Sequence, residues 1–190
     1  MHSTAKTAFG IPWFNHTPAI GVFRSNAIRD NRQTDGLATI STDPGQFIIE
    51  FLAQFAKFNR VHMGDEQARR DQLGMLLDST LDLKIIGDFL LASSKSIRTS
   101  QERRNFDRDL RFYLIDKVCA AIGSFSPRRL RMIDHYQDGV ATVVVTELTF
   151  SMISLHFRWL VVDKPGGWRV CNLVIEEIDL AMLLREKLNA

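Results

Sequence analysis

The sequence predicts an α+β domain in which helices from the first half of the chain pack on an antiparallel sheet from the second half. Apolar residues recur at helical spacing between residues 43 and 122, whereas residues 130–176 are rich in Val and include clean apolar/polar alternation. Asp138-Gly139, between two strand-like segments, is a hairpin-turn signal. Strands joined by short turns form a meander, so we expect four antiparallel strands and then one C-terminal helix.

The first predicted helix begins at Asp43-Pro44, because an aspartate side chain caps a helix and proline suits its first turn. Phe47, Phe51 and Phe55 follow at four-residue intervals and therefore share one face. Such a stripe is usually part of a protein core. The alternative is that part of it lines an apolar pocket.

Three further helices are predicted before the sheet. The second follows a break at residues 63–65, and the third is short and covers Leu83–Leu91. The fourth runs from Ser100, which can act as its N-cap, to Ile122. Strands are then expected at residues 130–136, 140–150, 154–162 and 168–176, with a final helix at 179–188.

Two of the predicted strands are apolar on both faces. Val143 and Val145 point away from Val144. In the last strand, Val170 and Val174 point away from Cys171, Leu173 and Ile175. An antiparallel sheet with one face in water would not need this pattern. Either helices cover both faces of the sheet, or one face lines a cavity.

The composition indicates one ordinary globular domain. The chain has 190 residues, of which 45% are hydrophobic and 24% charged. We expect an irregular N-terminal arm over residues 1–42 and a single domain over residues 43–190. The net charge of +2 gives no global case for nucleic acid as a partner. No apolar run approaches the roughly 20 residues of a membrane-spanning helix.

The sequence contains no motif that predicts catalysis or a bound metal. Its five histidines are scattered, without metal-ligand spacing, and no nucleophile elbow, phosphate-binding loop or dinucleotide fingerprint is present. Glu176 and Glu177 are adjacent strand residues that point to opposite faces, so they do not form an acid–base pair. Cys119 and Cys171 sit in apolar segments, which favours two buried thiols over one disulfide. We therefore predict no catalytic residue, no metal and no cofactor.

Arg128, Arg129 and Arg131 form the one basic cluster without interleaved acids. They are candidates for contact with an acidic partner or with anionic lipid headgroups. The simpler interpretation is a strand edge whose charges prevent aggregation.

Several segments resemble the MlaC family of toluene-tolerance or ABC-transporter auxiliary proteins, including its hopanoid-associated relatives. The similarity includes the Asp43-Pro44 helix start, the segment Leu81–Leu91, and Ser100-Gln101 at the start of the long helix. It also includes the strand that begins at Trp168 and the helix that contains Arg185. The sequence departs from the family pattern at Asn172, where aspartate is usual, and at Asp179, where serine is usual.

The resemblance implies a nuclear transport factor 2-like fold with an apolar cavity between helices and sheet. It implies a non-enzymatic, monomeric carrier that shuttles phospholipid or a related lipid in the periplasm. The expected partners are an inner-membrane ABC transporter complex and an outer-membrane lipid-transport complex. The first ten residues lack the pattern of a signal peptide, which fits either a cytosolic chain or one whose leader has been removed. The side chains expected to contact lipid are Phe47, Phe51, Phe55, Leu76, Ile85, Phe89, Phe112, Val143, Val145, Phe157, Trp159 and Val170.

Two other functions remain open from sequence. A small-molecule binder or enzyme of the nuclear transport factor 2-like type would need polar groups such as His156, Arg158 and Asp163 to converge inside the cavity. A protein-interaction module would instead use the three arginines or the apolar patch Ile11–Phe14.

Overall fold

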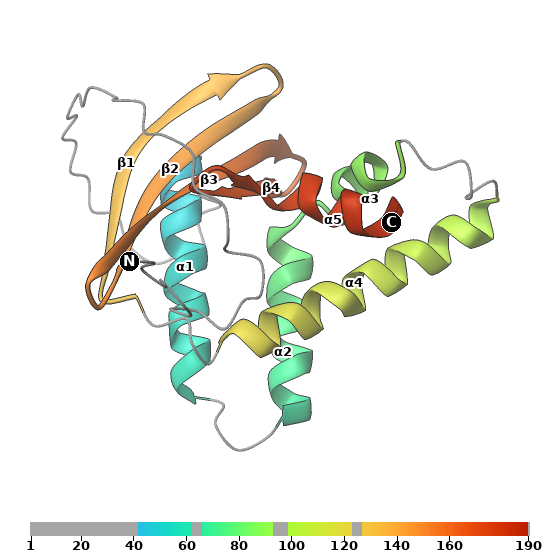
Figure 1. The fold of residues 1–190 in the computed structure, drawn as a ribbon, viewed down its shortest axis with the longest axis horizontal. Coiled ribbons are helices and arrows are strands. Elements are labelled where there is room, and N and C mark those ends of the chain that lie inside the picture. The colour runs from blue at the N-terminus through green and yellow to red at the C-terminus, as the bar shows by residue number, and fades with distance from the viewer. Residues whose placement is uncertain (1–41, 62–65, 93–98, 123–126, 190) are drawn as a thin grey trace, which may run out of the picture.

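The computed structural model describes residues 42–61, 66–92, 99–122 and 127–189 (Figure 1). Helices come first and an antiparallel sheet follows, as the sequence predicts. The helices before the sheet are α1 (Pro44–Val61), α2 (Glu66–Thr80), α3 (Leu83–Leu91) and α4 (Ser100–Ile122). They are followed by β1 (Arg129–Asp138), β2 (Ala141–Phe150), β3 (Ile153–Lys164), β4 (Gly167–Ile175), β5 (Ile178–Asp179) and α5 (Leu180–Asn189).

The sheet is a meander in the order β1-β2-β3-β4-β5, with every neighbouring pair antiparallel. It has one strand more than predicted. After β4 the chain turns at Glu176, whose φ of 54° is left-handed, and Ile178 pairs back on Ile175. The final helix consequently begins at Leu180 instead of Asp179.

The two faces of the sheet follow from its register. Val144 lies directly opposite Trp159, and Trp159 opposite Leu173, so these side chains share one face, which we call the core face. Val143 lies opposite Leu160 and points the other way. Val143 is only 3% exposed, so β2 is buried on both faces, as its two-sided apolar sequence predicts.

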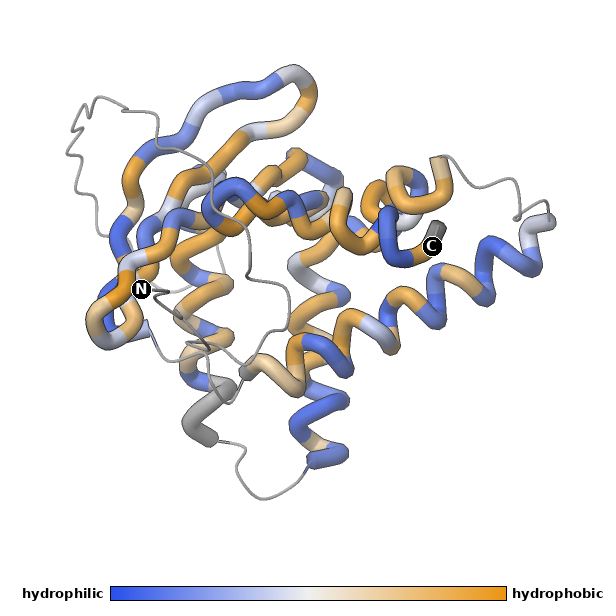
Figure 2. The backbone as a smooth tube through the Cα atoms, viewed as in Figure 1, coloured by the Kyte–Doolittle hydropathy of each residue, from blue (hydrophilic) through white to orange (hydrophobic). Residues whose placement is uncertain are grey.

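The core face lies against the first two helices. α1 contacts β1 and β2, and α2 contacts β4. Figure 1 shows α1 and α2 side by side, with the sheet next to them, α3 and α5 on the β4 side, and α4 crossing α2 and extending past α3. Figure 2 shows apolar residues concentrated in α1 and in the central strands, whereas α4 alternates between hydrophilic and hydrophobic positions along its length. The main core therefore lies between α1, α2 and the sheet.

The two edges of the sheet differ. At β4, the backbone of Leu81 forms a parallel bridge with Val170, and the amide of Asp82 donates to the Val170 carbonyl at 2.8 Å. β5 pairs along the same edge, so this side of the sheet is covered. The opposite edge is β1, most of whose residues are exposed.

Helix α4 has a different N-cap from the one predicted. Thr99, not Ser100, caps it: the Glu102 amide donates to Thr99 Oγ1 at 3.1 Å, and the Thr99 amide donates to Glu102 Oε2 at 2.8 Å. This reciprocal pair is a capping box, which satisfies two backbone donors at once. The prediction at Asp43 is confirmed, because its Oδ1 accepts the Gln46 amide at 2.7 Å.

Most of the predicted N-terminal arm lies outside the described residues, and so does the patch at 11–14. Thr42 is the described part of the arm. Its carbonyl accepts a hydrogen bond of 3.3 Å from Trp168 Nε1, which places it beside the start of β4.

Candidate functional site

An aromatic cluster forms the centre of the interior between α1 and the core face. The Phe51 ring meets Trp159 edge-on with centroids 5.9 Å apart, and Phe157 stacks on Trp159 at the same separation. Phe55 lies 6.0 Å from Phe51 along the helix. All four rings are buried. Helical spacing on α1 and alternation on β3 therefore bring these rings to one place, as the sequence predicts.

The interior contains two polar side chains that form a hydrogen bond with each other. Trp159 Nε1 donates a hydrogen bond of 2.9 Å to Thr146 Oγ1, and Thr146 has no exposed surface. A buried indole N–H without an acceptor would be costly, so the threonine lets tryptophan occupy an otherwise apolar site. The indole N–H is therefore already used and is not offered to a ligand.

The aromatic cluster is part of a larger core cluster of buried hydrophobic residues, and seven of the twelve predicted lipid-contact residues belong to this core cluster or pack against it. They come from α1, α2, β3 and β4, which are separate in sequence and meet here. These seven are Phe47, Phe51, Phe55, Leu76, Phe157, Trp159 and Val170.

The other five predicted residues lie elsewhere. Val143 and Val145 point to the opposite face of the sheet, because their β3 partners are Leu160 and Arg158. Ile85 and Phe89 are on α3 at the β4 side. The guanidinium of Arg185 on α5 lies 5.3 Å from the centroid of the Phe89 ring.

Phe112 is the fifth, and it is 54% exposed on α4. Ile115, three residues further along the same helix, is 5% exposed and belongs to the core cluster. The apolar positions predicted for this helix did not include Ile115. Its burial depends on Gly74 of α2, since a Cβ there would lie 3.3 Å from the Ile115 side chain. Glycine at this position allows α4 to approach α2 closely.

Sequence reasoning also left further core residues out of the site. They share the stripe of α1, the apolar side of α2 and the inward positions of β2 and β3. The signal for them was the same periodicity, which does not separate a general core from a binding site. They are Ile48, Leu52, Leu73, Leu77, Val144, Leu148, Phe150 and Val161.

Ion pairs hold α4 against α2. Arg111 binds Asp78 with two hydrogen bonds of 2.7 Å, and Arg70 pairs with Asp116. The carboxylates raise the pKa of both guanidinium groups, chiefly through hydrogen bonding. These groups are partly exposed, so the attachment of α4 depends on polar contacts more than that of α1 does.

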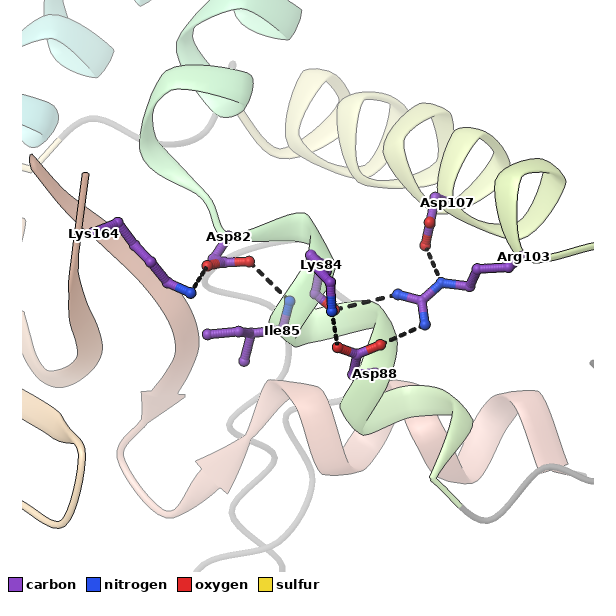
Figure 3. A network of polar contacts seen from close by, with 7 residues as sticks. All are labelled: Asp82, Lys84, Ile85, Asp88, Arg103, Asp107 and Lys164. Atoms are coloured by element: carbon purple, nitrogen blue, oxygen red, sulfur yellow. Dashed lines mark hydrogen bonds and ion pairs between the residues drawn. The ribbon is translucent and has the colours of Figure 1, made fainter. Parts of the chain in front are cut away.

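A second polar network joins α3 to α4 and to the end of β3 (Figure 3). Asp88 accepts from Lys84 at 2.8 Å and pairs with Arg103, which also binds Asp107 at 2.8 Å. Hydrogen bonds from Lys84 and then from Arg103 hold the pKa of Asp88 below its usual value.

At the other end of the network, Asp82 caps α3 by accepting the Ile85 amide at 2.8 Å, and Lys164 lies 3.1 Å away. The sequence predicts the helix Leu83–Leu91, and the structure confirms its bounds. The structure also shows that Leu81 and Asp82, just before this helix, fix it to the sheet.

The polar residues considered for catalysis do not converge in the interior. His156 and Arg158 point to the face opposite Trp159, because their β2 partners are Glu147 and Val145. His156 Nδ1 lies 3.5 Å from Glu176 Oε1, and Arg158 lies 3.6 Å from Glu177. Asp163 is exposed at the far end of β3. His156, Arg158 and their glutamate partners form a surface cluster on the outer face, to which Asp163 does not belong.

Both cysteines are free thiols. Burial raises the pKa of Cys119 and of Cys171, which reduces the thiolate fraction at neutral pH. The Cys171 thiol also donates to the Leu160 carbonyl at 3.3 Å. At Cys119 burial outweighs the charges of Arg70 and Arg69, which lower the pKa of the thiol.

Within the described ranges, no group of three or more His, Cys, Asp or Glu side chains is arranged to hold a metal ion. In the same ranges, none of the helices combines the length and the apolarity needed to cross a membrane.

Comparison with known proteins assigns the family. The family model of the MlaC protein matches residues 49–190, which is most of the chain. The chain belongs to the MlaC family. No curated protein matches this MlaC-family chain.

A solved structure shares the fold. It is the phospholipid-binding protein from Ralstonia solanacearum in complex with a phospholipid. The TM-score is 0.59 at 14% sequence identity, and the match covers 75% of this MlaC-family chain and 80% of the other. The predicted α+β fold of this family is therefore confirmed, with β5 as an additional short strand.

Proposed function

We propose that this chain is a non-enzymatic lipid carrier that binds the acyl chains of a phospholipid between α1, α2 and the core face of the sheet. The observation that supports it most is membership of the MlaC family together with a shared fold whose solved example holds a phospholipid. The interior supports it as well. Its lining is apolar, and its polar pair, Trp159 and Thr146, is internally satisfied.

The chemistry of an acyl chain fits such an interior. Moving two chains of about fifteen methylenes each out of water is favourable by roughly 25 kcal/mol of transfer free energy. This exceeds the ceiling of roughly 20 kcal/mol on the free energy of non-covalent binding. A carrier therefore exchanges lipid with a bilayer, and its interior need only match the apolarity of the bilayer. Rings and aliphatic side chains such as Phe51, Phe157 and Leu148 meet that need without a catalytic group.

Uptake requires the helices to separate from the sheet. Phe51, Phe55 and Trp159 are each at most 8% exposed, so the interior has to open before a chain enters. In this proposal α1 and α2 move away from the core face, and the headgroup stays outside. The bound lipid then replaces contacts between side chains that meet each other in its absence.

Family membership also supports a proposal for the cellular location of this carrier. We place it in the periplasm, as a monomer that moves lipid between an outer-membrane complex and an inner-membrane ABC transporter. We propose that Arg128, Arg129 and Arg131 contact an acidic partner or the lipid headgroup outside the interior.

Lipid extraction from the purified full-length chain tests the proposal. Organic extraction followed by mass spectrometry should release about one phospholipid per protein, and a variant with Phe51→Asp should carry much less. The matched control is Phe112→Asp, because Phe112 is an exposed ring away from the core. A well-folded wild-type protein that carries no lipid, and takes none from vesicles, would overturn the proposal.

A further inference from the structure

The turn between β2 and β3 presents apolar side chains to solvent. Phe150 pairs with Ile153 across the hairpin, so Ser151 and Met152 form the turn itself. Met152 is 98% exposed and Ile153 is 44% exposed, whereas Phe150 is 8% exposed. The hairpin therefore extends beyond the core, with a methionine at its tip.

Three arginines lie beside this tip. The Arg128 amide donates to the Thr149 carbonyl at 2.7 Å, Arg129 pairs with Thr149, and Arg131 pairs with Glu147. All three side chains are exposed. Within the described part of the chain, none of the three makes an ion pair. Their charges are therefore available to an external anion.

Protection of the sheet edge explains only part of this arrangement. β1 is an edge strand, and charges on Arg129 and Arg131 would discourage pairing with another chain. That role gives no reason for a fully exposed Met152 in a turn, where polar residues and glycine are usual. An apolar tip next to unpaired arginines is the pattern of a surface that enters a lipid interface.

We propose that Met152, Ile153, Arg128, Arg129 and Arg131 form a docking tip for an anionic lipid bilayer. Met152 and Ile153 enter the boundary between headgroups and acyl chains, while the guanidinium groups bind lipid phosphates with paired hydrogen bonds. A bilayer accepts an isolated protruding side chain anywhere on its surface, whereas an acidic protein would need a pocket shaped for Met152. The inference extends the proposed function, on which it rests, by naming the surface with which the carrier meets a membrane.

The experiment uses the full-length chain and sedimentation with vesicles of phosphatidylglycerol and phosphatidylcholine. Each arginine near an anionic leaflet should strengthen partitioning by about fivefold, so Arg128→Gln/Arg129→Gln/Arg131→Gln should weaken it by about a hundredfold at low salt. Met152→Ser, which leaves the charge unchanged, should also weaken binding by several-fold. High salt should weaken the wild type and have little effect on the triple variant.

The matched control is Arg104→Gln/Arg108→Gln/Lys117→Gln, which removes the same charge from exposed positions on α4. It should bind within about twofold to threefold of the wild type, since it keeps the docking tip. Equal losses of vesicle binding in both triple variants would show that net charge alone determines binding, and would overturn the proposal. Wild-type binding that is the same on pure phosphatidylcholine vesicles, or retention on immobilised polyglutamate but not on vesicles, would overturn it as well.

Lipid content separates this proposal from the proposed function. The triple variant and Met152→Ser should keep the bound lipid of the wild type after purification, because their side chains lie outside the interior. A protein that is free of lipid but binds vesicles through the tip would contradict the carrier function and leave the docking tip standing.

Discussion

The side-chain amide of Asn172 donates a hydrogen bond of 2.9 Å to Asp179, which ties β4 to the cap of α5. Asn172 Oδ1 also accepts the Leu173 and Ala181 amides, and Asp179 Oδ1 accepts the Met182 amide at 2.9 Å. Asn172 and Asp179 are two of the residues at which the sequence departs from the pattern that its resemblance to the family implies. In this chain the two positions are linked directly, with the side-chain donor at position 172 and the acceptor at position 179.

This link predicts a compensating pair of substitutions. Asn172→Asp alone should lower the free energy of unfolding by about 1–3 kcal/mol, because it removes the donor and sets two carboxylates together. Adding Asp179→Ser should recover a large part of the loss, since a serine hydroxyl can donate to the new carboxylate at position 172 and still cap α5. Urea unfolding of the wild type, both single variants and the double variant measures the coupling. Losses that simply add would show that the two residues are independent.

The buried pair Thr146 and Trp159 should show the same kind of coupling. Thr146→Val leaves the Trp159 N–H without an acceptor and should cost about 1–3 kcal/mol. Trp159→Phe removes the donor. It should therefore lower the free energy of unfolding less in the Thr146→Val variant than in the wild type. A double-variant cycle by chemical denaturation gives the coupling energy. A coupling near zero would mean that water or another group satisfies the indole.

The charge network at Asp88 predicts a pH-dependent contribution to stability. Its carboxyl pKa is held low in the folded protein by Lys84 and then Arg103. The contribution is therefore present above the unfolded pKa of about 4 and is lost as pH falls through the lower folded value.

Asp88→Asn should consequently destabilise the protein at neutral pH and have little effect in acid. Thermal unfolding of the wild type and the variant, compared over the acid range, measures this difference. Asp163→Asn, which removes an exposed carboxylate outside the network, is the matched control. A difference between wild type and Asp88→Asn that stays constant with pH would contradict the assignment.

The ion pairs of α4 predict that salt loosens this helix selectively. Arg111–Asp78 and Arg70–Asp116 are partly exposed, so added salt screens these ion pairs. Helix α1 is held by buried apolar contacts, which salt does not screen. Hydrogen exchange followed by mass spectrometry should show protection falling in α4 as sodium chloride is raised, with α1 unchanged. Equal loss in both helices would indicate global destabilisation, and no loss in α4 would show that apolar contacts such as those of Ile115 hold it.

The fold could be predicted from sequence because its main signals are local. Phenylalanine spacing on α1 and the alternation on β3 fix which faces are buried. The Asp138-Gly139 signal locates the first hairpin to within one residue, because Asp138 still pairs with Ala141 and the turn is Gly139 and Val140. Errors occurred where local signals compete. Thr99 and Ser100 are both possible caps, and Glu102 decides for Thr99 by reaching back to its amide.

The candidate site could be predicted only in part. Phe51, Phe157 and Trp159 meet because helix and strand periodicities both point inward. The orientation of Val143 was predicted, but the sequence did not show which face the first two helices cover. The position of Ile115 depends on the close approach of α4 to Gly74, which is a contact between elements far apart in the chain.

The central claim is that acyl chains bind beside Trp159, and fluorescence quenching tests it most directly. The protein has three tryptophans, so Trp13→Phe/Trp168→Phe leaves Trp159 as the reporter. Phospholipid with a nitroxide deep in its acyl chain should quench this fluorescence strongly, and lipid with the nitroxide on its headgroup should quench it weakly. Equal quenching by both lipids, or none by either, would contradict binding in the interior.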